Sequence, residues 1–557
     1  MDDPKKHNKT YDTATSSGGL QKLFRLVRHG TCQTDIFFIT CLLVLCITTI
    51  YIGVVPTHKF GHDTFFLLDN SWRVVNGQRT HVDYTSAWGP LSFILFALGL
   101  KLSHFTANGI GYGTAIFGFV IGLWSYRLGR DRLQSLTRVF FSLFMVGLVI
   151  SPYALSYGVL ATTHAMVYNR FGYALLGLIL LESMQPLQYP HVKTSEWLGG
   201  FSTGVAVALT FFLKISYFFA AILLIGGISL ICMRFARNRL FGFILGFSLI
   251  TIAFLFYLDF DLQAIFHDLQ MAAGARSESL PYNHLLNKFT MNAVYLPGVI
   301  LFGFASMMAM GSKRQPWKNL QLPLIGALVF VTDLFLIFTN QQWFELPLIA
   351  SFILIVFNNV TVHYRNEQSK GFFPSNRTYV MLLLVGAAIF LPIFVSQYVA
   401  LAHAAMEKRN PPKISLITRF TQPCLTEVLL YEGETVSSNG RQYTTYINEG
   451  VSLLLAVSKN HETVQTIDMF NPFPFALGRK PPTGGIAAAA YNYTFSDNHR
   501  PSDDQYFGNA DIVMVPKKPA ADGGYHFGAL KIYGPALKRN FSLAAETDWW
   551  YLYRRKK

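Results

Sequence analysis

Acidic and basic residues are concentrated in residues 61–91, GHDTFFLLDNSWRVVNGQRTHVDYTSAWGPL, between two apolar runs. Carboxylates such as Asp63 and Asp83 can accept a proton from a reacting hydroxyl group or orient a bound ligand. The acids of this stretch could equally have structural roles. Asp63 could cap the start of a helix, and Asp69 could pair with Arg73 one helical turn away.

The chain as a whole is too apolar for a water-soluble protein. Of its 557 residues, 51% are hydrophobic and 14% are charged, whereas soluble proteins average roughly 25% charged residues. Uncharged runs such as 36–55 and 379–402 have the length of about 20 residues that a helix needs to cross a bilayer. The net charge of +15 is clustered in loops between such runs, which is typical of cytoplasmic loops and argues against nucleic-acid binding.

We therefore predict a polytopic α-helical membrane protein with about 11 transmembrane helices (range 11–13) and a cytoplasmic N-terminus. The predicted spans are 36–55, 109–126, 138–156, 169–184, 197–213, 217–233, 240–258, 291–310, 321–339, 345–359 and 379–400. The apolar run 91–102 is too short to span and is expected to be an interfacial or re-entrant helix. The spacing of Phe65, Leu68 and Trp72 predicts an amphipathic helix along the membrane surface.

This topology divides the chain into three regions. Residues 1–35 form a cytoplasmic tail, and residues 36–402 form the transmembrane domain, with residues 56–108 as its first external loop. Residues 403–557 combine turn signals with strand-like runs, and we predict that they form an extramembrane mixed α/β domain on the outer face. The proline-rich stretch 468–485 is expected to be a structural loop, although its prolines, glycines and aromatic residues could instead form a rigid surface for sugar rings or a roof over the membrane cavity.

The first external loop resembles that of the GT-C glycosyltransferases. These polyprenyl-phosphate-sugar-dependent enzymes include protein O-mannosyltransferases and the lipid A aminoarabinose transferase. The matching residues are Asp63, Gly77, Asp83, Tyr84, Gly89 and Pro90. Residues 153–170, 209–218 and 336–354 resemble later segments of the family in the same order, so the resemblance covers about 400 residues.

The chain also departs from the family pattern. The family often has an Asp-Glu pair where this chain has Asp63 and Thr64. The aminoarabinose enzymes carry a lysine where Gly89 stands, and the second external turn often has an acid at the place of Thr162 or Thr163. These differences leave the sugar donor and any dependence on a metal ion open.

The resemblance implies that a monosaccharide is moved from a polyprenyl-phosphate donor to a glycan, lipid or protein acceptor, on the periplasmic face of a bacterial inner membrane. Asp63 matches the family aspartate and is the expected general base, with Asp83 in reserve. The departing phosphate needs groups that stabilise its growing charge. The candidates for this role are Arg170, with His164 and Asn169 beside it, Lys214 and Arg276.

Two of these cations have ordinary alternatives. Lys214 lies between two predicted helices, where a charge is costly and tends to be functional, but its side chain could instead extend to lipid headgroups. Arg276 lies in a long outer loop and could simply be solvated. Arg73, Tyr84 and Glu345 are candidates either for contacting the acceptor or for structural roles.

No residue spacing predicts a metal site, since His62 and His81 are too far apart to form one. No cofactor is predicted, although a divalent cation is left open. A transporter or flippase is an alternative function, in which Asp333, an acid within a predicted span, would couple ion movement. Transporter folds usually show internal repeats, and none is evident here. A non-catalytic membrane scaffold is a further alternative.

Overall fold

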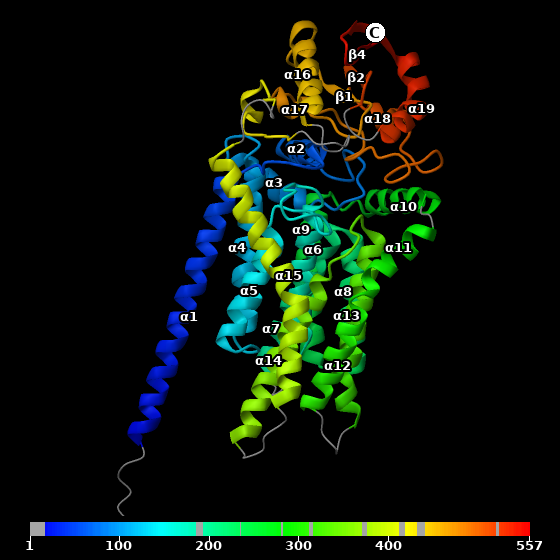
Figure 1. Ribbon diagram of the computed structural model, residues 1–557. Coiled ribbons are helices and arrows are strands. Elements are labelled where there is room, and N and C mark those ends of the chain that lie inside the picture. The colour runs from blue at the N-terminus through cyan, green and yellow to red at the C-terminus, as the bar shows by residue number, and fades with distance from the viewer. Residues whose placement is uncertain are drawn as a thin grey trace, which may run out of the picture.

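The computed structural model describes residues 17–184, 193–233, 235–279, 282–310, 316–369, 376–411, 418–431, 440–519 and 523–557. Long helices form a bundle, and the C-terminal part of the chain lies at one end of it (Figure 1). We call this end the outer end. Much of the predicted N-terminal tail, residues 1–16, lies outside the described residues.

Helices occupy each of the predicted spans. They are α1 (Ser17–Ile52), α4 (Gly109–Gly129), α5 (Ser135–Ile150), α6 (Val167–Ser183), α7 (Lys193–Leu213), α8 (Ile215–Ile231), α9 (Arg237–Tyr257), α12 (Leu296–Met310), α13 (Pro316–Thr339), α14 (Pro347–Ser369) and α15 (Asn376–Arg409). Among the described helices, 6 are long and apolar enough to cross a membrane, or 7 if α11 (Tyr282–Ala293) and α12, which meet at 47°, form one bent span. The helical nature of the bundle is confirmed, and the total of eleven crossings stays a prediction.

Small residues allow two of these helices to pack closely. A Cβ atom at Gly204 in α7 would lie 2.1 Å from the carbonyl oxygen of Phe243, and one at Gly242 in α9 would lie 2.1 Å from that of Trp197. Both separations are far below contact distance, so the backbones of α7 and α9 touch at these glycines. Such small-residue contacts are typical of helix pairs in membranes, where packing rather than water exclusion drives association.

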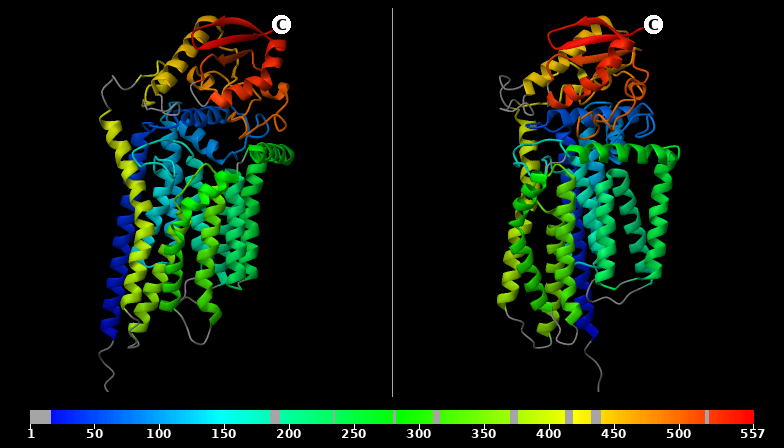
Figure 2. Two further views of the ribbon diagram at one scale, coloured as in Figure 1. Left: turned by 45° about the vertical axis from the view of Figure 1, so that its right-hand side comes forward. Right: turned by 90° about the vertical axis from the view of Figure 1, so that its right-hand side faces the viewer.

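Three helices at the outer end lie near the C-terminal part. They are α2 (Gly61–Val75), α3 (Leu91–Leu102) and α10 (Leu262–Ser279), and Figure 2 shows α2 and α10 lying across the end of the bundle. The predicted helix around residues 65–72 and the short helix at 91–102 are both confirmed. The prediction of a long loop around Arg276 is wrong, because α10 forms there; Asp261 accepts a hydrogen bond from the Ala264 N–H at 2.9 Å and caps its start.

The C-terminal part is built on a mixed four-stranded sheet. Its strands are β1 (Val464–Thr466), β2 (Ile512–Pro516), β3 (Phe541–Glu546) and β4 (Trp550–Arg555), in the order β1-β2-β4-β3. β1 and β2 are parallel, and the other pairs are antiparallel. The accompanying helices are α16 (Gly440–Val457), α17 (Phe473–Ala476), α18 (Asp503–Phe507) and α19 (Gly523–Asn540). The predicted combination of helices and strands is therefore present.

Residues 478–490 of the C-terminal part pack directly on α2, and we call them the covering loop. The Trp72 Nε1–H donates to the carbonyl oxygen of Arg479 at 2.8 Å. The Asn70 Nδ2–H donates to that of Ala487 at 3.0 Å. The proline-rich stretch thus serves as a structural contact with the first external loop, because its backbone carbonyls receive the polar side chains of α2.

Arg73 is the most deeply buried charge in this contact. Its side chain is 2% exposed, and its guanidinium group donates to the carbonyl oxygens of Pro482 and Gly484 at 3.0 and 3.1 Å. It pairs with Asp69 at 3.4 Å and lies over the Tyr84 ring, 4.9 Å from the centroid. Arg73 and Tyr84, candidates for the acceptor site or for structure, therefore occupy a structural contact between α2 and the covering loop.

Replacing Arg73 with Ala should loosen the C-terminal part from the bundle. The change leaves Asp69 buried without its cation, which typically costs about 3–5 kcal/mol. We expect a lower thermal unfolding midpoint and faster proteolysis of residues 478–490. The matched control is Arg127→Ala, because Arg127 pairs with Asp131 at the same i,i+4 spacing but both side chains are 66% exposed. That change should cost at most about 1 kcal/mol. Equal behaviour of the two variants would contradict the assignment.

Candidate active site

Asp63 lies in the first turn of α2, where the chain turns sharply. Phe60 precedes the helix in a left-handed conformation with φ 57°, and the Asp63 N–H donates to its carbonyl oxygen at 2.9 Å. The start of α2 has no side-chain cap. The Asp63 side chain is partly exposed, and within the described part of the chain its carboxylate has neither a hydrogen bond nor an ion pair. Helix capping therefore does not account for this acid.

Four tyrosines lie within electrostatic range of the Asp63 carboxylate: Tyr157, Tyr168, Tyr443 and Tyr493. They come from the loop after α5, the start of α6, α16, and the loop before α18. Burial raises the pKa of Asp63 to about 7, because a charged carboxylate is poorly solvated in such surroundings. The group can therefore take up or release a proton near neutral pH.

Lys214 lies in the break between α7 and α8, where its extended backbone separates the two helices. Its Nζ is 3.5 Å from Asn169 Oδ1 and also donates to Asn340 Oδ1. The ammonium group lies over the Tyr168 ring, 4.9 Å from the centroid. Two of the predicted phosphate-binding residues, Lys214 and Asn169, are thus neighbours, and Asn340 joins them.

Two further positive charges lie on the same side as Lys214. Arg276, on α10, lies over the Tyr493 ring, 4.4 Å from the centroid. Lys288, on α11, is buried and donates to the carbonyl oxygen of Asn340 at the end of α13. Burial, together with the charges of Arg276 and Lys288, lowers the pKa of Lys214 to about 7. A bound anion would hold the proton on Lys214, because it would offset that repulsion.

Two tyrosines connect the acid to the cations. Tyr168 is within electrostatic range of Asp63 and lies beneath Lys214, and Tyr493 is related in the same way to Asp63 and Arg276. The Asp63 carboxylate forms no ion pair with a described residue, and each of the two tyrosines lies within electrostatic range of it and in contact with a cation. Such an arrangement can take a proton at one position and hold an anion at another.

His164 and Arg170 are placed differently. His164 Nε2 accepts a hydrogen bond from the Val55 N–H at 2.9 Å, and burial lowers the pKa of this imidazole to about 3, so it is neutral. Arg170 Nη1 donates to the Tyr153 carbonyl oxygen at 2.6 Å. Both side chains are buried. The structure gives both residues contacts with the backbone of external segments and does not bring them to Lys214.

Asp83 is also separate from Asp63. Its carboxylate accepts hydrogen bonds from the backbone N–H and the Nε–H of Arg79 at 2.7 and 3.2 Å, closing a turn after α2. It lines a cavity of about 600 Å³ between the first external loop, α10 and the C-terminal part, together with Asp261, Asp268 and Asp504. Asp63 does not line this cavity, so the two acids lie in different places.

Glu345 lies in the loop between α13 and α14 and is partly exposed. Its backbone is left-handed with φ 71°, and the Tyr153 hydroxyl donates to its carboxylate at 3.3 Å. Burial raises the pKa of Glu345 to about 8. The neighbouring Phe344 carbonyl accepts from Ser156 Oγ at 2.6 Å, so the external loop after α5 contacts this acid.

Several residues of the site were not predicted from the sequence. The tyrosines around Asp63 and the amide of Asn340 carry no spacing signal, because they come from segments far apart in the chain. The structure also brings together one group of donor atoms that could hold a metal ion: His58, His403 and Glu407. The i,i+4 spacing of His403 and Glu407 was a signal for it, but their partner His58 could not be found by spacing.

Comparisons with known proteins give matches in structure only. No family model matches the chain, and no curated protein matches it. ArnT from Cupriavidus metallidurans in the apo state is 11% identical, with a TM-score of 0.46, 93% of this chain and 97% of that chain covered. The structure of the same ArnT bound to undecaprenyl phosphate is also 11% identical, with a TM-score of 0.43, and again 93% of this chain and 97% of that chain are covered.

A third match is the archaeal oligosaccharyltransferase AglB from Archaeoglobus fulgidus, in complex with an inhibitory peptide and a dolichol-phosphate. It is 10% identical, with a TM-score of 0.34 over 94% of this chain and 74% of that chain. ArnT and AglB are both GT-C glycosyltransferases, the family that the sequence motifs resemble. All of these TM-scores lie below 0.5, so no residue role in this chain is taken from these structures.

Asp63→Asn should make the protein more stable at pH 8 while leaving it nearly unchanged at pH 4. The folded-state pKa of about 7 lies above the ordinary value of 3.8, so the wild-type fold loses stability as the pH rises from 4 through 7. Asparagine cannot ionise and escapes that loss, which we place on the order of 1–2 kcal/mol at pH 8 because the side chain is partly exposed. Thermal unfolding at both pH values measures the difference.

The control for this pH series is Asp83→Asn. That change removes a carboxylate that accepts two hydrogen bonds from Arg79, so it should lower the unfolding midpoint at pH 8. If Asp63→Asn shifted the thermal unfolding midpoint by the same amount at pH 4 and at pH 8, the prediction would be wrong, because ionisation of the Asp63 carboxyl group would then not destabilise the fold.

Proposed function

We propose that this protein is a membrane glycosyltransferase that transfers a monosaccharide from a polyprenyl-phosphate donor to an acceptor hydroxyl group. The observation that carries the proposal is the Asp63 carboxylate, which has no hydrogen-bond partner in the described chain and lies within electrostatic range of Tyr168 and Tyr493, the two tyrosines whose rings contact Lys214 and Arg276. The motif around Asp63, which resembles the GT-C transferases, supports the same reaction.

In the proposed reaction the acceptor oxygen bonds to the anomeric carbon as the bond from that carbon to the phosphate oxygen breaks. Asp63 takes the proton of the acceptor hydroxyl group. Lys214 and Arg276 hold the departing phosphate, whose negative charge grows in the transition state. Asn169 and Asn340 hold the Lys214 ammonium group in place through their side-chain oxygens. The acceptor is a glycan, a lipid or a protein.

The proposal places the site on the outer face of a bacterial inner membrane, with residues 403–557 in the periplasm. The basic loops at the opposite end of the bundle support this orientation. The donor's lipid chain would lie against the bundle while its phosphate reaches the break between α7 and α8.

The transporter alternative relied on Asp333, and the structure gives that residue a different environment. Its carboxylate accepts hydrogen bonds from the N–H groups of Leu348 and Ile349, at 3.4 and 2.9 Å, in the first turn of α14. An acid that satisfies the free N–H groups of a helix start has a structural reason to be buried. Asp333 therefore gives no specific support to ion coupling.

Asp63→Asn should abolish transfer without abolishing donor binding. Loss of a positioned general base typically costs 10²–10⁴-fold in rate, so we expect at least a hundredfold loss of polyprenyl phosphate release from polyprenyl-phosphate sugars in proteoliposomes. Binding of undecaprenyl phosphate, measured separately, should stay within about threefold of wild type. The control is Asp131→Asn, which removes an exposed carboxylate and keeps the Asp63 base. Wild-type turnover by Asp63→Asn would refute the assignment of the base.

Lys214→Met should weaken the binding of undecaprenyl phosphate. A charge-assisted hydrogen bond contributes about 1.5–3 kcal/mol, so the dissociation constant should rise at least tenfold. Because the pKa of free Lys214 is lowered to about 7, wild-type binding should also weaken as the pH rises above 7, and the variant should lack that part of the pH dependence. Lys101→Met, an exposed lysine at the end of α3, is the control. Unchanged affinity in Lys214→Met would exclude this lysine from the phosphate site.

A further inference from the structure

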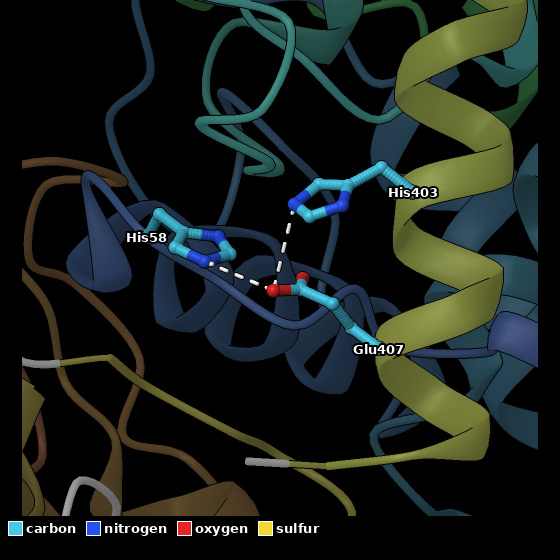
Figure 3. Close-up of side chains that lie close together, drawn as sticks. All are labelled: His58, His403 and Glu407. Atoms are coloured by element: carbon cyan, nitrogen blue, oxygen red, sulfur yellow. Dashed lines mark ion pairs between the residues drawn. The ribbon is translucent and has the colours of Figure 1, made fainter.

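Three side chains converge at the outer end of the bundle, away from the charges around Lys214. His58 lies in the connection between α1 and α2, and His403 and Glu407 lie one turn apart near the end of α15 (Figure 3). The apolar stretch of α15 from Val380 to Arg409 has 30 residues, which is about 45 Å of helix. This exceeds the hydrocarbon thickness of about 30 Å, so α15 is longer than a single crossing needs, and its last turns contact the connection between α1 and α2 through Glu407 and His58.

The donor atoms of this group already have the separations of a metal site. His58 Nε2 lies 3.2 Å and His403 Nε2 lies 3.5 Å from the same oxygen, Glu407 Oε1. All three donor atoms lie within 4.8 Å of one another. Ligands at 2.0–2.2 Å from a tetrahedral zinc ion are about 3.3 Å apart, so two of the three separations fit without movement.

Hydrogen bonding fixes which nitrogen of His58 carries the proton. Thr162 Oγ1 donates to the Pro56 carbonyl oxygen, which can only accept. The same Oγ1 lies 2.9 Å from His58 Nδ1, and since its one hydrogen is used, it must accept the Nδ1–H. With that proton on Nδ1, Nε2 lies 3.2 Å from Glu407 Oε1. A second ring proton or a metal ion between the two atoms accounts for this short separation, because two lone pairs would repel one another.

The surroundings leave room for that cation. The side chains of His58 and His403 are 25% and 23% exposed, so an ion can reach them from water. Lys408, next to Glu407 in sequence, is held by Glu427 at 2.7 Å and does not supply the missing charge. A hydrogen bond from Nδ1 to an outer partner, as His58 makes with Thr162, is typical of histidines that bind metals through Nε2.

We propose that His58, His403 and Glu407 bind a divalent cation of the zinc class, through two imidazole nitrogens and one carboxylate oxygen. Two imidazoles favour Zn²⁺ or Co²⁺ over Mg²⁺ and Ca²⁺, which prefer oxygen ligands. Water completes the coordination on the exposed side. No described side chain of the Asp63 site belongs to this group, so the ion has a structural role.

The ion would join three parts of the chain at one point. His58 stacks on the Tyr431 ring, 4.1 Å between centroids, and the Tyr431 N–H donates to the Thr57 carbonyl oxygen at 2.9 Å. The segment that leads into the C-terminal part thus touches the same connection that leads into α2. Fixing His58 to α15 would hold both segments at the outer end of the bundle.

The test measures zinc in the full-length protein, purified with an affinity tag that contains no histidine. Wild type should carry about one zinc ion per chain by mass spectrometry of the metal. Chelation with EDTA should lower its thermal unfolding midpoint, and Zn²⁺ but not Mg²⁺ should restore it. His403→Gln and Glu407→Gln keep side-chain volume and should lower the zinc affinity at least tenfold. His461→Gln, an exposed histidine of the C-terminal part, should behave as wild type.

Two results would overturn the proposal. One is a wild-type protein that holds less than a tenth of a zinc ion per chain after exposure to Zn²⁺ and whose thermal unfolding midpoint does not change when EDTA is added. The other is a His403→Gln or Glu407→Gln variant with wild-type zinc affinity. If both variants fail to fold, the wild-type measurements alone decide. None of these readouts involves sugar transfer, so the result is independent of the proposed function.

Discussion

The buried guanidinium group of Arg73 is the constraint on which the outer end of the molecule depends. A charge with 2% of its side chain exposed persists only if its partners stay in place, and two of those partners are carbonyl oxygens of Pro482 and Gly484 in the covering loop. The backbone adds to this contact, since the Gly484 N–H donates to the Asp83 carbonyl oxygen at 2.7 Å. The first external loop and the C-terminal part therefore form one structural unit. The position of Asp63, ten residues before Arg73 on the same helix, depends on that unit.

The acid and the cations of the candidate site do not pair with one another: the Asp63 carboxylate forms no ion pair with a described residue. If the Lys214 ammonium group contacted the Asp63 carboxylate, the two would form an ion pair, the carboxylate would become a weaker base, and the positive charge would be unavailable to an anion. Tyr168 and Tyr493 instead offer their ring faces to Lys214 and Arg276, and both tyrosines lie within electrostatic range of Asp63. Burial raises the pKa of Asp63 and lowers the pKa of Lys214, and such shifts are common at ligand-binding sites.

The sequence predicted the helices, whose positions follow from hydrophobic periodicity and from the thickness of the bilayer. It did not predict contacts between segments that are far apart in the chain. Apolar runs located the bundle helices, and the spacing of Phe65, Leu68 and Trp72 located α2. Lys214 was found because a lysine between apolar helices is expensive. His164 and Arg170 looked similar in the sequence, yet each makes a hydrogen bond with the backbone, at Val55 and at Tyr153, which no spacing rule reveals. Tyr493 reaches Asp63 only because the C-terminal part folds back over α2, and a local pattern cannot show that.

The hydroxyl groups of Thr162 and Thr163 shape the chemistry around the connection between α1 and α2. Here the two hydroxyl groups donate to the carbonyl oxygens of Pro56 and Lys59, which an aspartate would instead repel. Thr162 can therefore hold the connection between α1 and α2 and still accept the Nδ1–H of His58. Thr162 thereby turns Nε2 of His58 towards Glu407 Oε1 at the end of α15, where the proposed cation would bind.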